Sequence, residues 1–221
     1  MKSGIFQNRS VFVSKSSLQG GFIAGPILVG IALIIAIVAF MAFANRGPAT
    51  STSTQQNKIN SSLLLKQGAD LSEGYARAIG DGLTPAQVTF DTTTGTGLFD
   101  PTKGYAVEQT VTTKMCAGTT APDCLWKLNK SLTVTTVGTT AADTVIAVNN
   151  LTVGTCEAIN ATLYNEVGDG AGANVPTSAV TGASIVAGTA GDMGLTAGAG
   201  RTDGCVKNGT SYTFYKVVNP V

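Results

Sequence analysis

The sequence predicts an α+β protein in which a long N-terminal helix packs on an antiparallel β-sheet. Three observations predict it: an uncharged apolar run at 22–44, an amphipathic segment at 54–80, and short Val- and Thr-rich segments separated by Gly, Pro, Asp and Asn over the rest. The first two patterns are typical of helices and the third is typical of strands. We therefore expect one helix with a membrane half and an amphipathic half.

The apolar run is long enough to cross a membrane. Phe22 to Ala44 are 23 consecutive residues without a charge or a hydrogen-bonding side chain, and as a helix they span roughly 35 Å. Lys2, Arg9 and Lys15 precede the run and no acidic residue does. The positive-inside rule then predicts a cytoplasmic N-terminus, with the residues after the run outside.

Three interpretations of this N-terminal region stay open. A secretory signal could be cut after Ala42-Phe43-Ala44, but its apolar core normally has only about 7 to 15 residues. An uncleaved anchor explains charge and length, but not why Gly20-Gly21 stands directly before Phe22. A polar, basic leader that ends in Gly and is followed by Phe at the start of an apolar helix resembles the class III leader of type IV pilins and pseudopilins.

This resemblance implies a processed subunit of an extracellular filament, a pilus or fimbria. Residues 1–21 correspond to the leader, a prepilin peptidase would cut between Gly21 and Phe22, and Phe22 would become methylated. Residues 22–44 correspond to a transmembrane helix that later lies in the filament core. The implied partners are further copies of the chain, the peptidase, the pilus assembly machinery and the inner membrane. Filaments of this family serve cell adhesion, motility, DNA uptake, conjugation or secretion.

Pro26 departs from the family pattern. It would be the fifth residue of the mature chain, where these pilins usually carry Glu. A proline close to the first turn of a helix is tolerated, because the N–H it lacks would have no partner there. The departure indicates either that another contact sets the register between subunits during assembly, or that the chain is a minor or tip subunit.

Small residues interrupt the apolar run, and Ala32 and Ala36 have the spacing that lets two helices approach closely. We expect this helix to pack on its neighbours in a filament; the alternative is that it touches only lipid. The candidate packing residues are Gly25, Gly30, Ala32, Ala36 and Ala39.

A hinge and a second helical segment follow. Gly47-Pro48 breaks the pattern, so 45–53 are expected to form a hinge and 54–80 an amphipathic helix that ends at Gly80-Asp81-Gly82. In the pilin family the second half of the N-terminal helix packs on the sheet, and this segment has the matching character. An ordinary amphipathic helix is the alternative. Its apolar face is expected to contain Ile59, Leu63, Leu64, Leu71, Tyr75, Ala78 and Ile79.

Residues 81–221 are expected to form one globular β-rich domain. The predicted strands lie at 86–90, 104–113, 124–137, 142–153 and 211–218. Leu132, Val134 and Val137 are expected to face the amphipathic helix, and Trp126 is expected to lie in the core. A short helix is predicted from a Thr155 N-cap to Gly168, followed by a long Gly-rich loop to Gly204.

Four cysteines in an exported chain without histidine indicate two disulfides rather than a zinc site. Three connectivities are possible, and we favour Cys116 with Cys124, which closes a short turn. The second bond, Cys156 with Cys205, resembles the disulfide-bounded C-terminal region of type IV pilins.

Other functions find little support. With no histidine, Ser/His/Asp and Cys/His catalytic sites are excluded, and we expect neither an enzyme nor a cofactor. From Arg46 onward 11 basic residues face 13 acidic ones, 11 − 13 = −2, so nucleic acid is not attracted. A Ca²⁺ site from Asp169, Asp192 and Asp203 is a minor alternative without the usual calcium-loop pattern. The alternative to a filament subunit is a membrane-anchored binding module that does not polymerise, on the surface or in the periplasm.

Overall fold

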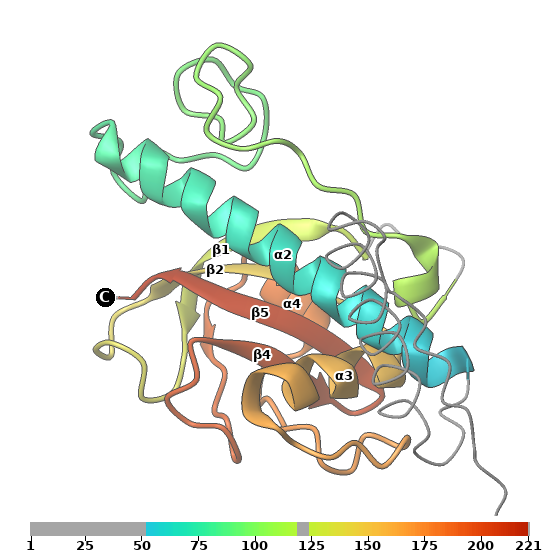
Figure 1. Cartoon of the computed structure of the whole chain (residues 1–221). Coiled ribbons are helices and arrows are strands. Elements are labelled where there is room, and N and C mark those ends of the chain that lie inside the picture. The colour runs from blue at the N-terminus through green and yellow to red at the C-terminus, as the bar shows by residue number, and fades with distance from the viewer. Residues whose placement is uncertain (1–51, 119–123, 221) are drawn as a thin grey trace, which may run out of the picture. The chain divides into compact units, whose positions relative to one another are not determined.

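A computed structural model of the chain (Figure 1) describes residues 52–118 and 124–220. The regular elements in these ranges are α2 (Thr52–Gly80), the 3₁₀ turn η1 (Thr113–Met115), β1 (Trp126–Thr133), β2 (Asp143–Val148), α3 (Val153–Tyr164), α4 (Gly182–Val186), β3 (Gly191–Asp192), β4 (Asp203–Asn208) and β5 (Ser211–Asn219).

Helix α2 runs along one face of the sheet (Figure 1) and begins two residues before the predicted start at Thr54. It ends at Gly80 as predicted, because Gly82 adopts a positive φ of 94° and the N–H groups of Gly82 and Leu83 turn back onto the carbonyls of Ile79 and Ala78. The buried face differs from the prediction at the N-terminal half. Ile59 is 61% exposed and Leu63 is 38% exposed, and the buried positions there are Leu64, as predicted, and the polar Asn60 and Ser61.

The five strands form one mixed sheet in the order β3-β1-β2-β5-β4. Strands β1, β2, β5 and β4 pair antiparallel, whereas β3 pairs parallel to β1 through Gly191 and Asp192. The prediction of a purely antiparallel sheet is therefore wrong. Strand β3 has only two residues, and β2, α3 and α4 lie between β1 and β3 in the sequence. Nothing local in the sequence therefore indicates this pairing.

Two hydrophobic clusters cover the two faces of the sheet. Trp126, Ile146, Val148 and Phe214 pack with the buried residues of α2 and α3. The second cluster lies on the opposite face around α4 and joins Ile185, Met193 and Leu195 to Val145, Ala147 and Tyr215. Strand β2 is buried at every position because both faces are covered.

Leu132, Val134 and Val137 belong to this second cluster, so they do not face α2 as predicted. The register of β1 shifts between Asn129 and Leu132, and this bulge moves the residues after it to the other face. Trp126 lies before the shift and is buried against α2 as expected, with its indole N–H donating to Gln67 Oε1 at 3.1 Å.

The predicted strands at 86–90 and 104–113 are not formed. This part is a lobe of turns beyond the C-terminal half of α2 (Figure 1), with one isolated bridge between Thr89 and Gly97. Asp91 and Asp100 accept N–H and hydroxyl hydrogen bonds from their own loop, which competes with strand pairing.

The expected fold class needs one further correction. The predicted leader, the membrane half of the N-terminal helix and most of the hinge fall in 1–51, outside the described residues. Of the predicted N-terminal helix, the structure therefore describes only the amphipathic half, α2. Among the described helices, none has the length and apolar character needed to cross a bilayer. The described part is an α+β domain with a mixed sheet between two helical layers, not a long apolar helix on an antiparallel sheet.

Candidate functional site: the α2–α3 groove and the disulfide-closed loop

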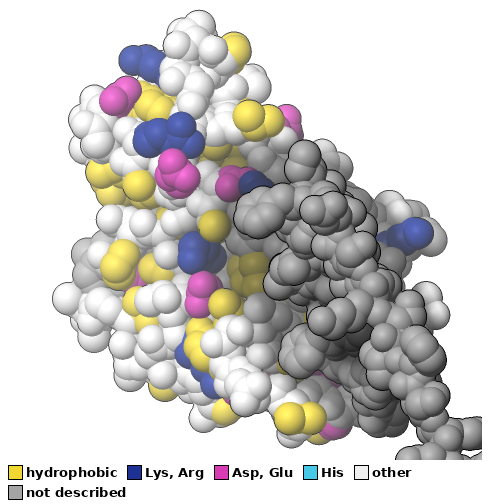
Figure 2. Space-filling view, viewed as in Figure 1, with side chains coloured by type: hydrophobic (Ala, Val, Ile, Leu, Met, Phe, Trp, Pro, Cys, Tyr) yellow, Lys and Arg dark blue, Asp and Glu magenta, His cyan; other side chains and the backbone are white. Residues whose placement is uncertain are grey.

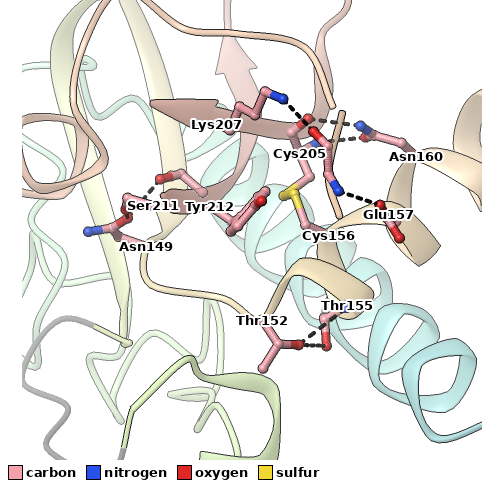
Figure 3. Close-up of a disulfide and its surroundings, with 12 residues drawn as sticks. Asn149, Thr152, Thr155, Cys156, Glu157, Asn160, Cys205, Lys207, Ser211 and Tyr212 are labelled. Carbon is pink, nitrogen blue, oxygen red and sulfur yellow. Dashed lines mark hydrogen bonds between the residues drawn. A yellow bond between two sulfur atoms is a disulfide. The ribbon is translucent and has the colours of Figure 1, made fainter. Parts of the chain in front are cut away.

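Helix α3 begins three residues earlier than predicted. Thr152 is the N-cap, since its hydroxyl accepts the N–H of Thr155 at 3.2 Å. The helix ends before Gly168, because Asn165 takes the left-handed conformation at φ 55°. The two hydroxyls of Thr152 and Thr155 also bond to each other at 2.8 Å (Figure 3).

A groove of about 790 Å³ lies between the N-terminal half of α2 and helix α3. Its two helical walls carry mostly small and polar side chains, among them Ser62 on α2 and Ala158 and Ala161 on α3. Gly154 allows the helices to approach, because a Cβ at that position would collide with the side chain of Asn57. One edge of the groove is formed by Gly168 and Gly170 of the following loop.

The disulfide Cys156–Cys205 ties α3 to β4, with the two Cα atoms 5.3 Å apart. One turn further along α3, the side-chain amide of Asn160 pairs with the backbone of Cys205 (Figure 3). The bond and the amide together close the segment 157–204 at its base. The disulfide Cys116–Cys124 closes the shorter turn, so both pairs are those favoured from the sequence.

Glu157 organises the start of the closed segment. Glu157 is only 8% exposed, and its carboxylate accepts the N–H groups of Gly170 and Gly172 at 2.8 to 3.1 Å. Gly168 lies directly against it, where a Cβ would be 2.7 Å from Glu157 Oε2. The sequence Gly168-Asp169-Gly170 is thus a loop, as expected, but one shaped around a carboxylate from α3.

A partly buried polar cluster holds the far end of the closed segment. Arg201 bonds Glu166 at 2.5 Å and stacks over the Tyr164 ring at 3.9 Å. The Tyr164 hydroxyl donates to Asp203, which also pairs with Lys216 at 3.2 Å. Burial, with a smaller contribution from Asp203, raises the pKa of Tyr164 to about 12. Burial also raises the pKa of Tyr215, whose hydroxyl donates to the carbonyl of Arg201.

Charges on the visible face are mixed in sign. Figure 2 shows basic and acidic side chains interspersed on it, without a basic stripe. On α2 they form i,i+4 pairs, Lys66 with Asp70 at 2.6 Å and Glu73 with Arg77 at 3.9 Å. Such exposed pairs contribute well under about 1 kcal/mol each.

The structure does not bring the three candidate calcium ligands together. Asp169 accepts N–H groups of its own loop, Asp192 bonds Thr135 and Gly194, and Asp203 bonds Tyr164 and Lys216. Within the described ranges, no group of three or more His, Cys, Asp or Glu side chains is placed to hold a metal ion.

The remaining predicted site residues lie outside the described part of the chain. They are Gly21, Phe22, Gly25, Gly30, Ala32, Ala36 and Ala39. Conversely, Glu157 and Asn160 were not singled out from the sequence. Their only signal is that each stands within four residues of Cys156 on one predicted helix.

Comparisons with models of protein families, with characterised proteins and with solved structures give no significant match.

The groove and the closed segment are rigid surfaces. The groove offers small side chains and hydroxyls on two rigid helices, and the closed segment is fixed at both ends by covalent and polar contacts. Rigid surfaces of this kind lose little conformational entropy when another molecule docks on them.

Proposed function

We propose that this protein is a structural subunit of an extracellular type IV pilus-like filament, made as an inner-membrane precursor and processed after Gly21. The observation that carries the proposal is the sharp boundary in the sequence at Gly20-Gly21-Phe22, between a leader with three basic and no acidic residues and an uncharged apolar run. A secretory signal does not explain the length of the apolar run. An uncleaved membrane anchor does not explain the Gly20-Gly21-Phe22 boundary.

Features of the described domain support this proposal. Its two disulfides suit an oxidising compartment outside the cytoplasm. The domain braces a long loop rich in Gly and Ala against α3 and β4, which suits a part exposed to mechanical load and proteases. The charge pairs on α2 leave no strong field that would keep copies of the chain apart.

Pro26 favours a minor or tip subunit within this class. A subunit in the body of the filament is thought to use the usual Glu to neutralise the terminal amine of its neighbour, and this chain has no acidic residue before Asp70. A subunit at the tip, or one present in few copies, can do without that contact.

The experiment that tests processing is mass spectrometry of the mature protein. We expect Phe22 as the first residue, with a methylated amine. Replacing Gly21→Leu should leave the precursor uncut, whereas the matched control Gly20→Leu, one residue before the cut, should still be processed. A mature chain that starts at Asn45 would show that the Ala42-Phe43-Ala44 site is used and would overturn the proposal.

A second candidate is a membrane-anchored binding module that does not polymerise. The α2–α3 groove of about 790 Å³ favours it, since this volume is within the range of ligand pockets. An uncut chain in the membrane, recovered from no filament, would favour this candidate.

A further inference from the structure

The segment at residues 107–112 is prone to form a strand but has no strand partner in the described part of the chain. Its sequence is Val-Glu-Gln-Thr-Val-Thr, and it lies within the predicted strand 104–113 that is not formed. None of its backbone N–H groups donates a hydrogen bond to another group of the described ranges. A local preference that the fold leaves unmet is expected at functional sites.

The segment runs extended alongside α2 (Figure 1). A Cβ at Gly74 would lie 2.6 Å from that of Ala106, and the Gln67 side chain donates to the carbonyl of Thr110 at 3.0 Å. Gly74 and Gln67 are about 10 Å apart along the helix axis. The chain from Ala106 to Thr110 covers this distance at about 2.6 Å per residue, far more than the helical rise of about 1.5 Å.

Only one edge of the segment is free. In a strand the N–H and C=O of one residue point to the same edge, and those of the next residue point to the other edge. Because the carbonyl of Thr110 accepts from Gln67, the backbone groups of the even-numbered residues face α2. Those of the odd-numbered residues, such as Gln109, face away. The side chains alternate as well, since Val111 is buried between the exposed Thr110 and Thr112.

Strand β1 has a second free edge. On one side it pairs with β2 from Trp126 to Leu132, but on the other side β3 pairs only with Leu132 and Thr133. The side chain of Asn129 accepts the N–H of Ser131 at 2.8 Å. The outer edge of 126–130 therefore has no strand beside it in the described ranges. An open edge of this kind can pair with a strand of another molecule.

The charges of the two free edges are complementary. Glu108 is the charged residue of the segment, and Lys127 and Lys130 are those of β1. Lys130 donates to the carbonyl of Ala86. Glu108 and Lys127 are both exposed, and neither forms an ion pair within the described ranges.

This complementarity selects between the possible pairings. Two copies of the β1 edge would bring lysines together, and two copies of the segment would bring glutamates together. Like charges on paired strands are destabilising, whereas opposite charges stabilise the pair. The free edge of the segment therefore fits the free edge of β1 better than either edge fits a copy of itself.

We propose that the 107–112 segment of one copy of this chain adds as a strand to the outer edge of β1 in a second copy, with Glu108 close to Lys127. A contact between two different surfaces repeats from copy to copy and builds a ring or an open chain. The inference deepens the proposed function and rests on it. It gives the subunits of a filament a contact between their folded domains in addition to that of the apolar helices.

Carbodiimide cross-linking of sheared filaments tests the contact, because this reagent joins a carboxylate to an amine only where the two touch. The filaments are assembled from the full chain, and the cross-linked products are separated by size and digested. We expect a peptide that joins Glu108 to Lys127 in the dimer and larger products. It should be missing from the monomer, which shows that the link is between copies.

Exchange of the two charges tests the same contact in assembly. Glu108→Lys and Lys127→Glu should each lower the amount of protein in the filament pellet by about fivefold or more, since like charges then meet. The variant with both substitutions should return to within about twofold of the unmodified protein. The matched control Lys103→Glu, at an exposed lysine outside both edges, should have no effect. Membrane levels of each variant show that it is made and inserted.

Filaments that contain the protein but yield no link between Glu108 and Lys127 would overturn this inference and leave the proposed function standing. So would normal assembly of Glu108→Lys, or a double variant that assembles no better than the single ones. If the unmodified protein is found in no filament, the proposed function itself fails and this contact fails with it.

Discussion

The side-chain amide of Asn160 on α3 forms two hydrogen bonds with the backbone of Cys205 on β4, in the way that a neighbouring strand would. The Nδ2 group of Asn160 donates to the carbonyl of Cys205 at 2.9 Å, and the N–H of Cys205 donates to Oδ1 at 2.8 Å. Strand β4 is the last strand of the sheet, so these two backbone groups have no strand beside them. The Asn160 amide therefore completes the sheet edge next to the disulfide.

Replacing Asn160→Ala should destabilise the domain. It leaves the buried N–H and carbonyl of Cys205 without partners, at a cost of about 1 to 3 kcal/mol for each group. Urea unfolding of the oxidised protein measures the loss. The control Thr162→Ala, at an exposed position on the same helix, should stay within about 0.5 kcal/mol of the unmodified protein. Equal unfolding midpoints for the two variants would contradict the role of the amide.

The two disulfides should differ in their contribution to stability. Cys156–Cys205 has a sequence separation of 49 and Cys116–Cys124 one of 8. The chain-entropy relation then gives about 4 kcal/mol for the first and about 2.5 kcal/mol for the second. Replacing each pair by serines and comparing the free energies of unfolding tests the order. Peptide mapping without reduction should find the same two pairs, and a link between Cys116 and Cys156 would refute them.

One substitution at two positions of α2 should have opposite effects. At Gly74 a Cβ would lie 2.6 Å from that of Ala106 and 2.7 Å from the carbonyl of Tyr105, so Gly74→Ala should cost about 1 to 3 kcal/mol. At Gly80 a Cβ would meet nothing within 4 Å and φ is not positive. Gly80→Ala should therefore be neutral or stabilise by up to about 1 kcal/mol.

Urea midpoints of the two alanine variants, read from the fluorescence of the single tryptophan Trp126, check this prediction. A neutral Gly74→Ala would contradict the contact between α2 and the 105–106 segment, and a destabilising Gly80→Ala would contradict the open space beside Gly80.

Stability should fall at alkaline pH. A tyrosine in the unfolded chain loses its proton near about pH 10, whereas the pKa of Tyr164 in the folded protein is raised to about 12. The unfolded state therefore binds fewer protons between these values, and the contribution of Tyr164 to stability is lost as the pH rises through them.

Absorbance titration of tyrosinate, read directly after a pH jump, should show at least one of the five tyrosines ionising well above the others. Asp203→Asn should lower the pKa of Tyr164 only in part, since burial is the larger cause. A single titration step near the ordinary tyrosine value would contradict the burial of this cluster.

Local signals in the sequence predicted part of the fold. The glycines at 80 and 82 marked the end of α2, the run of Tyr, Phe and Val marked β5, and the place of Trp126 at the start of a predicted strand indicated its burial. What could not be predicted depends on distant partners. Strands β3 and β4 and helix α4 lie among Gly, Ala and Thr residues, without apolar periodicity, and are fixed by β1, β5 and the disulfide.

For the candidate site too, the sequence predicted some features, while others depend on partners that are distant in the sequence. The short spacing of Cys116 and Cys124 indicated one disulfide, and a resemblance to a known disulfide-bounded region indicated the other. Neither carried information on Glu157 and Asn160, which accept from or donate to backbone groups 13 to 45 residues away. Ile59 and Leu63 were misplaced for a related reason. Periodicity identifies a face of α2, but burial at its N-terminal half follows the approach of Gly154 on α3.

The most direct test of the central proposal is the location of the protein after cells are sheared and the released filaments are pelleted. We predict that the protein is in this fraction. Ala36→Leu should remove it from the filaments while membrane levels stay unchanged, because the larger side chain prevents close helix packing without reducing hydrophobicity. The control Ile35→Leu should have no effect. If the unmodified protein never leaves the membrane, the filament proposal is contradicted.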